Sequence, residues 1–183
     1  MGDRNGDEEA LVRAAMDGDT AAFTTLVERY QQRIGGYLYH LVGNRETAED
    51  LTQETFMHAY RALPTAHAVS AFRAWLFRIA TNLARDHLRR QRRIHWLPFD
   101  SDRMEFAGHP FSLVEEADTV RQVLARLSAE DRTVLLLCAG DGLSYGEAGV
   151  VLGVTTNTAR MRYTRSKKRF QALYREMTGD AAP

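Results

Sequence analysis

The most regular hydrophobic pattern in the chain lies between Ala71 and Arg93. Apolar side chains recur there at steps of three and four, at Phe72, Trp75, Leu76, Ile79 and Leu83. This spacing, uninterrupted by glycine or proline, is typical of one face of an amphipathic α-helix. The other face carries seven arginines and one acid, Asp86. We predict a helix whose first half is buried and whose last turns form a basic surface.

Two more helical stripes precede this helix, and a short helix from Glu8 to Met16 precedes both. The first stripe ends at Gly43-Asn44, and the second runs from Arg45 to about Ala62, before Pro64. Their apolar faces consist of Phe23, Val27, Tyr30, Ile34, Tyr37 and Leu41, and of Ala48, Leu51, Thr55, Phe56, Ala59 and Leu63. Each stripe predicts a helix that packs through one face, and residues 64–70 are predicted to form a loop.

The helical pattern is lost after Arg93 and returns near Leu113. Ser128 and Ser144 are placed to cap two helices, each with an acidic residue three positions later. A turn containing glycine at residues 153–156 then leads into a basic helix at residues 157–177. A short helix, a tight turn and a basic helix together form the helix-turn-helix pattern.

These elements predict an all-α protein with two small helical domains joined by a flexible linker, the C-terminal domain containing the helix-turn-helix. No strand pattern interrupts the helical ones. The predicted boundaries are a disordered N-terminus at 1–7, an N-terminal domain at 8–93, the linker at 94–112, a C-terminal domain at 113–178 and a tail at 179–183.

The distribution of charge adds a functional indication. The 183 residues include 24 basic and 24 acidic side chains, and a formal net charge of zero argues by itself against a nucleic-acid-binding protein. The basic residues are concentrated, however, in the helix ending at Arg93 and in residues 144–183. Local patches set the potential that a polyanion meets, so both segments are candidate phosphate-binding surfaces. The alternatives are a solvated helix end and a basic helix that only closes a bundle.

The sequence offers little support for catalysis. The six histidines lack the spacing of a metal site or a catalytic triad, and there is no glycine-rich phosphate loop. The single cysteine, Cys138, lies in an apolar run and fits a packed small side chain better than a redox centre. We therefore expect no enzymatic activity and no cofactor. The polar N-terminus and the lack of about eighteen consecutive apolar residues predict a cytoplasmic protein without a membrane span.

Five sequence blocks together resemble the extracytoplasmic-function sigma factors of bacterial RNA polymerase. They are LTQETF, WLFRIATNLARDHLRRQRR, LSAEDRTVLLL, GLSYGEAG and LGVTTNTARMRYTRSKKR, and the resemblance spans residues 8 to about 176. Members of this family are small two-domain subunits that confer promoter recognition on the polymerase. The resemblance implies three partners: the polymerase core, promoter DNA as duplex and as melted strand, and an anti-sigma factor.

The resemblance also assigns roles to three sets of residues. Core polymerase binding falls on Asp50, Leu51, Gln53, Glu54 and Phe56. Promoter melting and the downstream element fall on Arg73, Trp75, Asn82, Arg85, Arg89 and Arg90, with Asn82 near the pocket for a flipped base. The upstream element falls on Ser144, Tyr145, Thr155, Thr156, Asn157, Thr158, Arg160, Met161, Arg162 and Arg165 of the helix-turn-helix.

The helix-turn-helix departs from the family pattern at three places. The family usually has Glu-Ile-Ala where this chain has residues 147–149, Glu-Ala-Gly, and Gly-Thr-Val where it has residues 157–159, Asn-Thr-Ala. Met161 replaces a recurrent serine. The smaller residues that end both triplets make the pairing of the two helices looser or closer than usual.

A stand-alone helix-turn-helix transcriptional regulator is the alternative function. Such a protein needs neither the polar set at Asp50, Gln53 and Glu54 nor the arginine-rich end of the Ala71–Arg93 helix. These two features favour the sigma factor.

Overall fold

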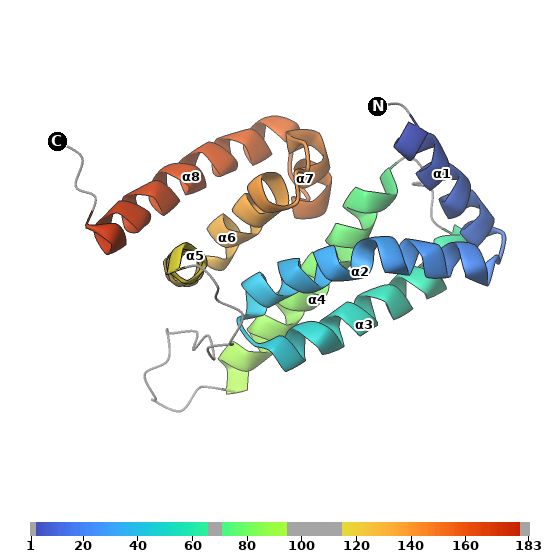
Figure 1. Ribbon diagram of the computed structural model, residues 1–183, viewed down its shortest axis with the longest axis horizontal. Helices are drawn as coiled ribbons and strands as arrows, with labels where there is room; N and C mark the ends of the chain where they lie inside the picture. Colours follow the sequence, from blue (N-terminus) through green and yellow to red (C-terminus); the bar gives the residue numbers. More distant parts are fainter. Residues whose placement is uncertain (1–2, 66–70, 95–114, 180–183) are drawn as a thin grey trace.

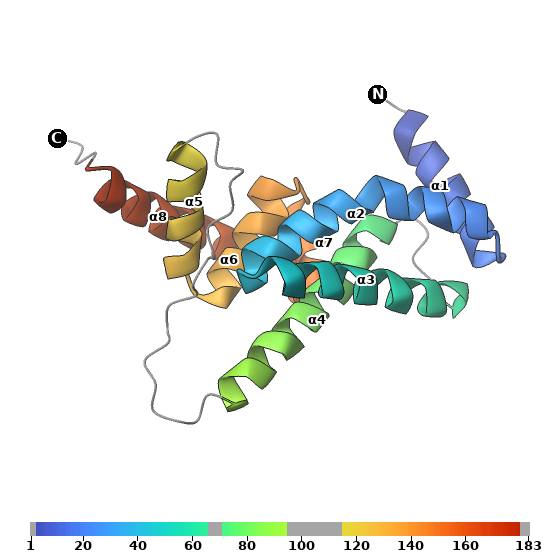
Figure 2. The same cartoon turned by 60° about the horizontal axis from the view of Figure 1, so that its bottom comes forward.

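The computed structural model describes residues 3–65, 71–94 and 115–179, and every regular element in those ranges is helical (Figure 1). The helices form two groups, α1–α4 and α5–α8, that lie beside each other in both views (Figure 2). This arrangement confirms the predicted all-α class with two helical regions. Of the predicted linker at 94–112, only the first residue is described, and it belongs to a helix. Of the predicted loop at 64–70, the structure describes the first two residues, which lie in a 3₁₀ turn, and residues 66–70 lie outside the described residues.

The first group holds the chain up to Ile94. Its elements are α1 (Asp3–Met16), α2 (Thr20–Val42), α3 (Arg45–Ala62), the 3₁₀ turn η1 (Leu63–Thr65) and α4 (Phe72–Ile94). Helix α1 begins earlier than the predicted Glu8, so the described part of the predicted disordered N-terminus is helical. The Tyr30 hydroxyl donates to Glu8 at 2.7 Å, which ties α1 to α2.

The core of this group lies between α2, α3 and α4. Leu76, Phe77 and Ala80 of α4 are fully buried, and the Phe77 ring meets the Tyr37 ring edge to face with centroids 5.1 Å apart. Three residues of the predicted stripe are half-buried instead: Trp75, Ile79 and Leu83. The buried face therefore extends to Phe77, because three helices, α2, α3 and α7, pack on α4 and cover a wider arc than one neighbour would.

The second group carries the helix-turn-helix. Its elements are α5 (Glu115–Arg126), α6 (Ala129–Leu135), the π-helical turn η3 (Leu136–Gly140), α7 (Tyr145–Leu152) and α8 (Thr156–Thr178). Both predicted caps are confirmed: the Ser128 and Ser144 hydroxyls accept backbone N–H groups three residues later, at 3.1 and 3.2 Å. The helix after Ser128 widens where the Asp141 N–H donates to the Leu136 carbonyl at 2.8 Å, five residues back.

Candidate functional site

The outward face of α3 carries the residues predicted to bind core polymerase. Asp50 and Gln53 are exposed, and 47 % of the Glu54 side chain is exposed. Leu51 and Phe56 were predicted in the same set, but they are 6 % and 8 % exposed and pack into the core. Their burial agrees with their place in the predicted apolar stripe of this helix, and it puts them behind the polar face, which they support from inside. Their membership of the polymerase-binding set stays a prediction.

Two exposed apolar side chains extend this face and were not predicted. Met57 is 52 % exposed and Tyr60 is 49 % exposed. They follow Gln53 by four and seven residues, a spacing that keeps all three on one side of the helix. The Tyr60 ring also meets Phe23 of α2 edge to face, with centroids 5.0 Å apart, which restricts its position. Met and aromatic side chains are enriched at protein interfaces, so this face has both polar and apolar contacts to offer.

An exposed row of side chains runs along α4. It consists of Arg78, Asn82, Arg85 and Arg89, at steps of four, three and four. This spacing brings the predicted residues Asn82, Arg85 and Arg89 together on one side and adds Arg78, which the predicted set lacked. Arg89 also bonds to Asp86 at 2.9 Å. Arg90 is exposed nearby, and the half-buried Trp75 packs against Phe72 with ring centroids 5.7 Å apart.

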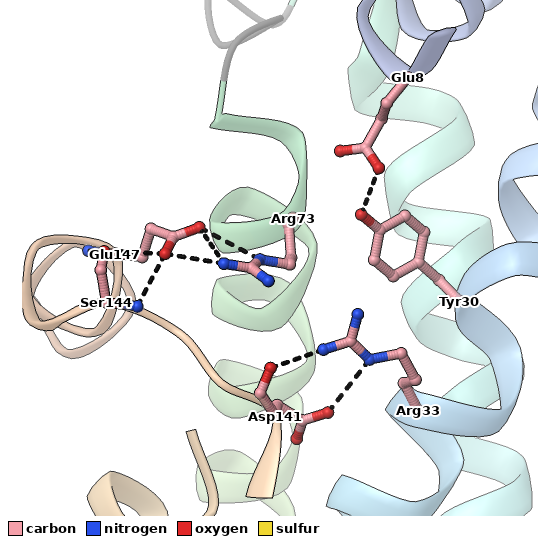
Figure 3. Close-up of polar contacts among 7 residues, drawn as sticks. All are labelled: Glu8, Tyr30, Arg33, Arg73, Asp141, Ser144 and Glu147. Atoms are coloured by element: carbon pink, nitrogen blue, oxygen red, sulfur yellow. Dashed lines mark hydrogen bonds and ion pairs between the residues drawn. The ribbon is translucent and has the colours of Figure 1, made fainter. Parts of the chain in front are cut away.

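Arg73 does not belong to this row. It lies nine residues before Asn82, which is about two and a half helical turns and therefore the opposite side of α4. Its guanidinium donates to the Glu147 carboxylate of α7 in a fork: Nη2 lies 2.7 Å from Oε1 and 2.8 Å from Oε2, and Nε lies 3.1 Å from Oε1 (Figure 3). Arg73 therefore lies apart from the exposed row on α4, and its bonds to Glu147 join the two helix groups.

Glu147 serves two elements at once. Besides Arg73, its carboxylate accepts the Ser144 N–H and hydroxyl, both at 2.8 Å, which completes the capping box of α7 (Figure 3). Burial opposes ionisation of Glu147, but the hydrogen bonds from Arg73 and Ser144 outweigh it and lower its pKa. The carboxylate is therefore charged at neutral pH and connects α4 to the first turn of α7.

A second polar contact between the groups involves Arg33 of α2. Its Nη2 donates to the Asp141 carbonyl at 2.6 Å, and its Nε lies 3.4 Å from the Asp141 carboxylate (Figure 3). Burial raises the pKa of Asp141 to about 6, although the nearby Arg33 charge lowers it. A third contact comes from buried Arg132, whose Nη1 donates to the Leu41 carbonyl at 3.0 Å. No local pattern in the sequence predicts these contacts, because the paired residues lie 108 and 91 positions apart in the chain.

The turn between α7 and α8 is tight because of Gly149. A Cβ on Gly149 would lie 2.8 Å from the Val154 carbonyl oxygen, closer than real Cβ contacts. The Val154 N–H donates to the Gly149 carbonyl at 2.9 Å, and Gly153 turns the chain with a φ of 68°. The backbone of the turn therefore lies directly against Gly149 of α7, where there is no room for a side chain.

Helix α8 divides into an inner and an outer face. Ala159 and Ser166 are fully buried against the other helices of the group. The outer face near the N-terminus is exposed and holds Asn157, Arg160, Met161 and Arg165. Two of these side chains touch, since Arg160 Nη2 donates to Asn157 Oδ1 at 3.0 Å. This face has the donors, acceptors and cations that a major groove can accommodate.

Most of the other residues predicted to contact the upstream element cap a helix or pack within the helix-turn-helix. The hydroxyls of Ser144 and Thr155 cap α7 and α8, and Thr158 bonds to Thr155 at 2.9 Å. The Tyr145 ring packs on the Tyr163 ring with centroids 5.6 Å apart. Arg162 is half-buried, whereas Thr156 is exposed at the first turn.

The back of α8 is held by Asp131, a residue that the predicted sets did not include. Its buried carboxylate accepts hydrogen bonds from Ser128, Ser166 and Arg169. Burial acts to raise the pKa of the Asp131 carboxyl group. The three hydrogen bonds lower this pKa by more than burial raises it, so the net shift is downward. Arg169 is thereby engaged with Asp131 and orients α8 from behind.

Comparison with known proteins identifies both helix groups. The family model "Sigma-70 region 2" matches residues 26–94, and "Sigma-70, region 4" matches residues 117–170. The RNA polymerase sigma-H factor of Pseudomonas aeruginosa is 36 % identical over 92 % of this chain and 96 % of its own length. The ECF RNA polymerase sigma factor SigW of Bacillus subtilis is 28 % identical over 91 % of this chain and 96 % of its own.

Two solved structures share the fold. CnrH in complex with the cytosolic domain of CnrY superposes with a TM-score of 0.71 at 28 % identity, over 91 % of this chain and 96 % of that one. The sigma factor RpoE of Bartonella quintana, in complex with the anti-sigma factor NepR, gives 0.71 at 26 % identity, over 82 % and 95 %. None of the described helices is long and apolar enough to cross a bilayer. The chain therefore belongs to the extracytoplasmic-function sigma factors, which direct promoter recognition and transcription initiation by bacterial RNA polymerase and are not enzymes.

Proposed function

We propose that the outward face of α3 binds core polymerase and that α4 and α8 contact promoter DNA at two separate elements. The observation that carries this proposal is the exposed row Arg78, Asn82, Arg85 and Arg89 on α4, which lies in a different helix group from the basic outer face of α8. A stand-alone regulator reads duplex DNA with its helix-turn-helix and has no need of a second basic helix.

The row on α4 suits a separated strand. Arginines at steps of three and four form a cationic track for consecutive phosphates. Asn82 lies within this track, and its amide offers both a donor and an acceptor to the edge of an unstacked base. We assign residues 8–93 to core binding and the downstream element, residues 113–178 to the upstream element and residues 94–112 to the connection.

An anti-sigma factor is the further partner that we propose. CnrH is bound to the cytosolic domain of CnrY, and RpoE is bound to the anti-sigma factor NepR. Similar folds over most of this chain support the same kind of control here. A cytoplasmic location follows from the proposed partnership with RNA polymerase.

The docking part of the proposal is tested by Asp50→Arg combined with Glu54→Arg. Both residues lie on α3 outside the core, so the fold should persist while the polymerase interface loses about 2–5 kcal/mol. Co-purification with core polymerase measures the loss. Asp17→Arg with Glu28→Arg is the matched control, because it reverses two exposed acids that are not part of α3. Normal co-purification of the α3 variant would show that polymerase binds elsewhere.

A further inference from the structure

Met161 is the most exposed large apolar side chain in the part of the chain that the structure describes. It is 60 % exposed, more than Met57 at 52 % or Val150 at 49 %. It lies in the second turn of α8, opposite the buried residues Ala159 and Ser166. Its side chain therefore points away from the domain core and contributes nothing to holding the two helices of the motif together.

The neighbours of Met161 on this face are polar or cationic. Asn157 lies one turn before it and Arg165 one turn after it, and Arg160 precedes it directly. All three of these neighbours are exposed. The thioether is thus an isolated apolar group within a basic surface, and not part of an apolar patch of the kind that binds another protein. A polyanion with an apolar feature of its own fits this surface best.

The major groove of DNA presents one such feature. Adenine, guanine and cytosine offer hydrogen-bonding groups there, whereas thymine adds a C5 methyl group. A thioether is apolar and polarisable and only a weak acceptor, so it gains most from contact with that methyl group. The flanking cations supply the attraction to the phosphates on either side.

We propose that Met161 reads a thymine methyl group in the upstream promoter element, next to the base pairs that face Asn157 and Arg165. This inference rests on the proposed function, in which α8 enters the major groove. It makes Met161 a specificity-determining residue and explains why a flexible apolar side chain occupies the centre of a cationic face.

The test removes the C5 methyl group from the DNA and the thioether from the protein, first separately and then together. Holoenzyme formed from this chain and core polymerase first selects preferred upstream sequences from duplexes randomised over ten base pairs. Each thymine of the selected sequence is then replaced by deoxyuridine, which lacks only the C5 methyl group. Burying a methyl group contributes about 0.8 kcal/mol, so one replacement should weaken binding about fourfold.

Met161→Ala should abolish the response to deoxyuridine at that single position and leave the other positions unchanged. Met161→Leu should keep the response, because leucine still offers an apolar contact. Val150→Ala is the control, since Val150 is exposed on α7 and outside α8. Because Met161 is exposed, thermal unfolding should be the same for all variants.

Two results would overturn the inference. In the first, replacing any thymine by deoxyuridine leaves holoenzyme binding unchanged. In the second, deoxyuridine weakens the binding of Met161→Ala as much as that of the unmodified protein. The proposed function fails in a different way. In that case the unmodified holoenzyme selects no upstream sequence at all.

Discussion

Reversing the charge of Arg73 tests whether its ion pair with Glu147 holds α7 against α4. The Arg73 guanidinium donates three hydrogen bonds of 2.7–3.1 Å, and both side chains are 29 % exposed. Arg73→Glu removes these bonds and places a second carboxylate beside Glu147. The Ser144 N–H and hydroxyl still donate to Glu147, so the first turn of α7 should remain folded.

The size of the effect follows from the partial burial of the pair. Hydrogen bonds between charged groups contribute about 1.5–3 kcal/mol, and fully exposed ion pairs about 0.2–1 kcal/mol. With most of each side chain covered, we expect a loss of about 1–2 kcal/mol. This corresponds to a shift of roughly five- to thirtyfold from docked toward separated helix groups.

Energy transfer between two dyes measures this shift. Thr24→Cys on α2 and Arg175→Cys on α8 place the dyes on exposed positions of the two groups, in a Cys138→Ala background. Arg73→Glu should lower the transfer efficiency. Arg78→Glu is the matched control, because it makes the same charge change on the exposed side of α4 and should leave the efficiency unchanged. Equal efficiency in Arg73→Glu and the unmodified protein would refute a holding role for the ion pair.

Gly149→Ala should destabilise the protein by about 1–3 kcal/mol and weaken holoenzyme binding to the upstream element, because its Cβ would meet the Val154 carbonyl at 2.8 Å. Gly146→Ala is the control, because a Cβ on Gly146 would lie an ordinary 3.8 Å from its nearest neighbour, the Ser144 hydroxyl; equal melting temperatures of the two variants would contradict the lack of room at Gly149. Burial raises the pKa of Asp141 in the folded protein to about 6, whereas the pKa in the unfolded chain is 3.8. The folded protein therefore loses stability as the pH rises from 3.8 to about 6, because the buried carboxyl group must ionise. Asp141→Asn should therefore be more stable than the unmodified protein at pH 7.5 and match it near pH 4 in denaturant unfolding; lower stability at pH 7.5 would show that the Arg33 ion pair outweighs burial.

Local sequence signals predicted much of the fold. The apolar periods located α2, α3 and α4, and Ser128 and Ser144 marked helix starts because capping depends on residues three positions apart. The helix-turn-helix was predictable for the same reason. The start of α1 was missed, since residues 3–7 carry no apolar period.

The candidate sites were less predictable because contacts with a partner, and contacts between helices far apart in the chain, leave no local pattern. The family pattern placed Leu51 and Phe56 in the polymerase set, but it does not distinguish a residue that touches a partner from one that supports the face. Met57 and Tyr60 share the helical period of that face, so the sequence could have predicted them. The partner of Arg73 lies 74 residues away, and no local spacing reveals a contact of that range.

Permanganate footprinting of the promoter tests the central claim, that the exposed row of α4 captures the melted strand. Holoenzymes containing the unmodified protein or the variant Asn82→Ala with Arg85→Ala are compared on a promoter found by run-off transcription of genomic fragments. The variant should bind core polymerase normally, fail to expose thymines in the closed duplex, and recover on a template opened in advance by mismatches. Equal permanganate reactivity of the two holoenzymes on the closed duplex would contradict it.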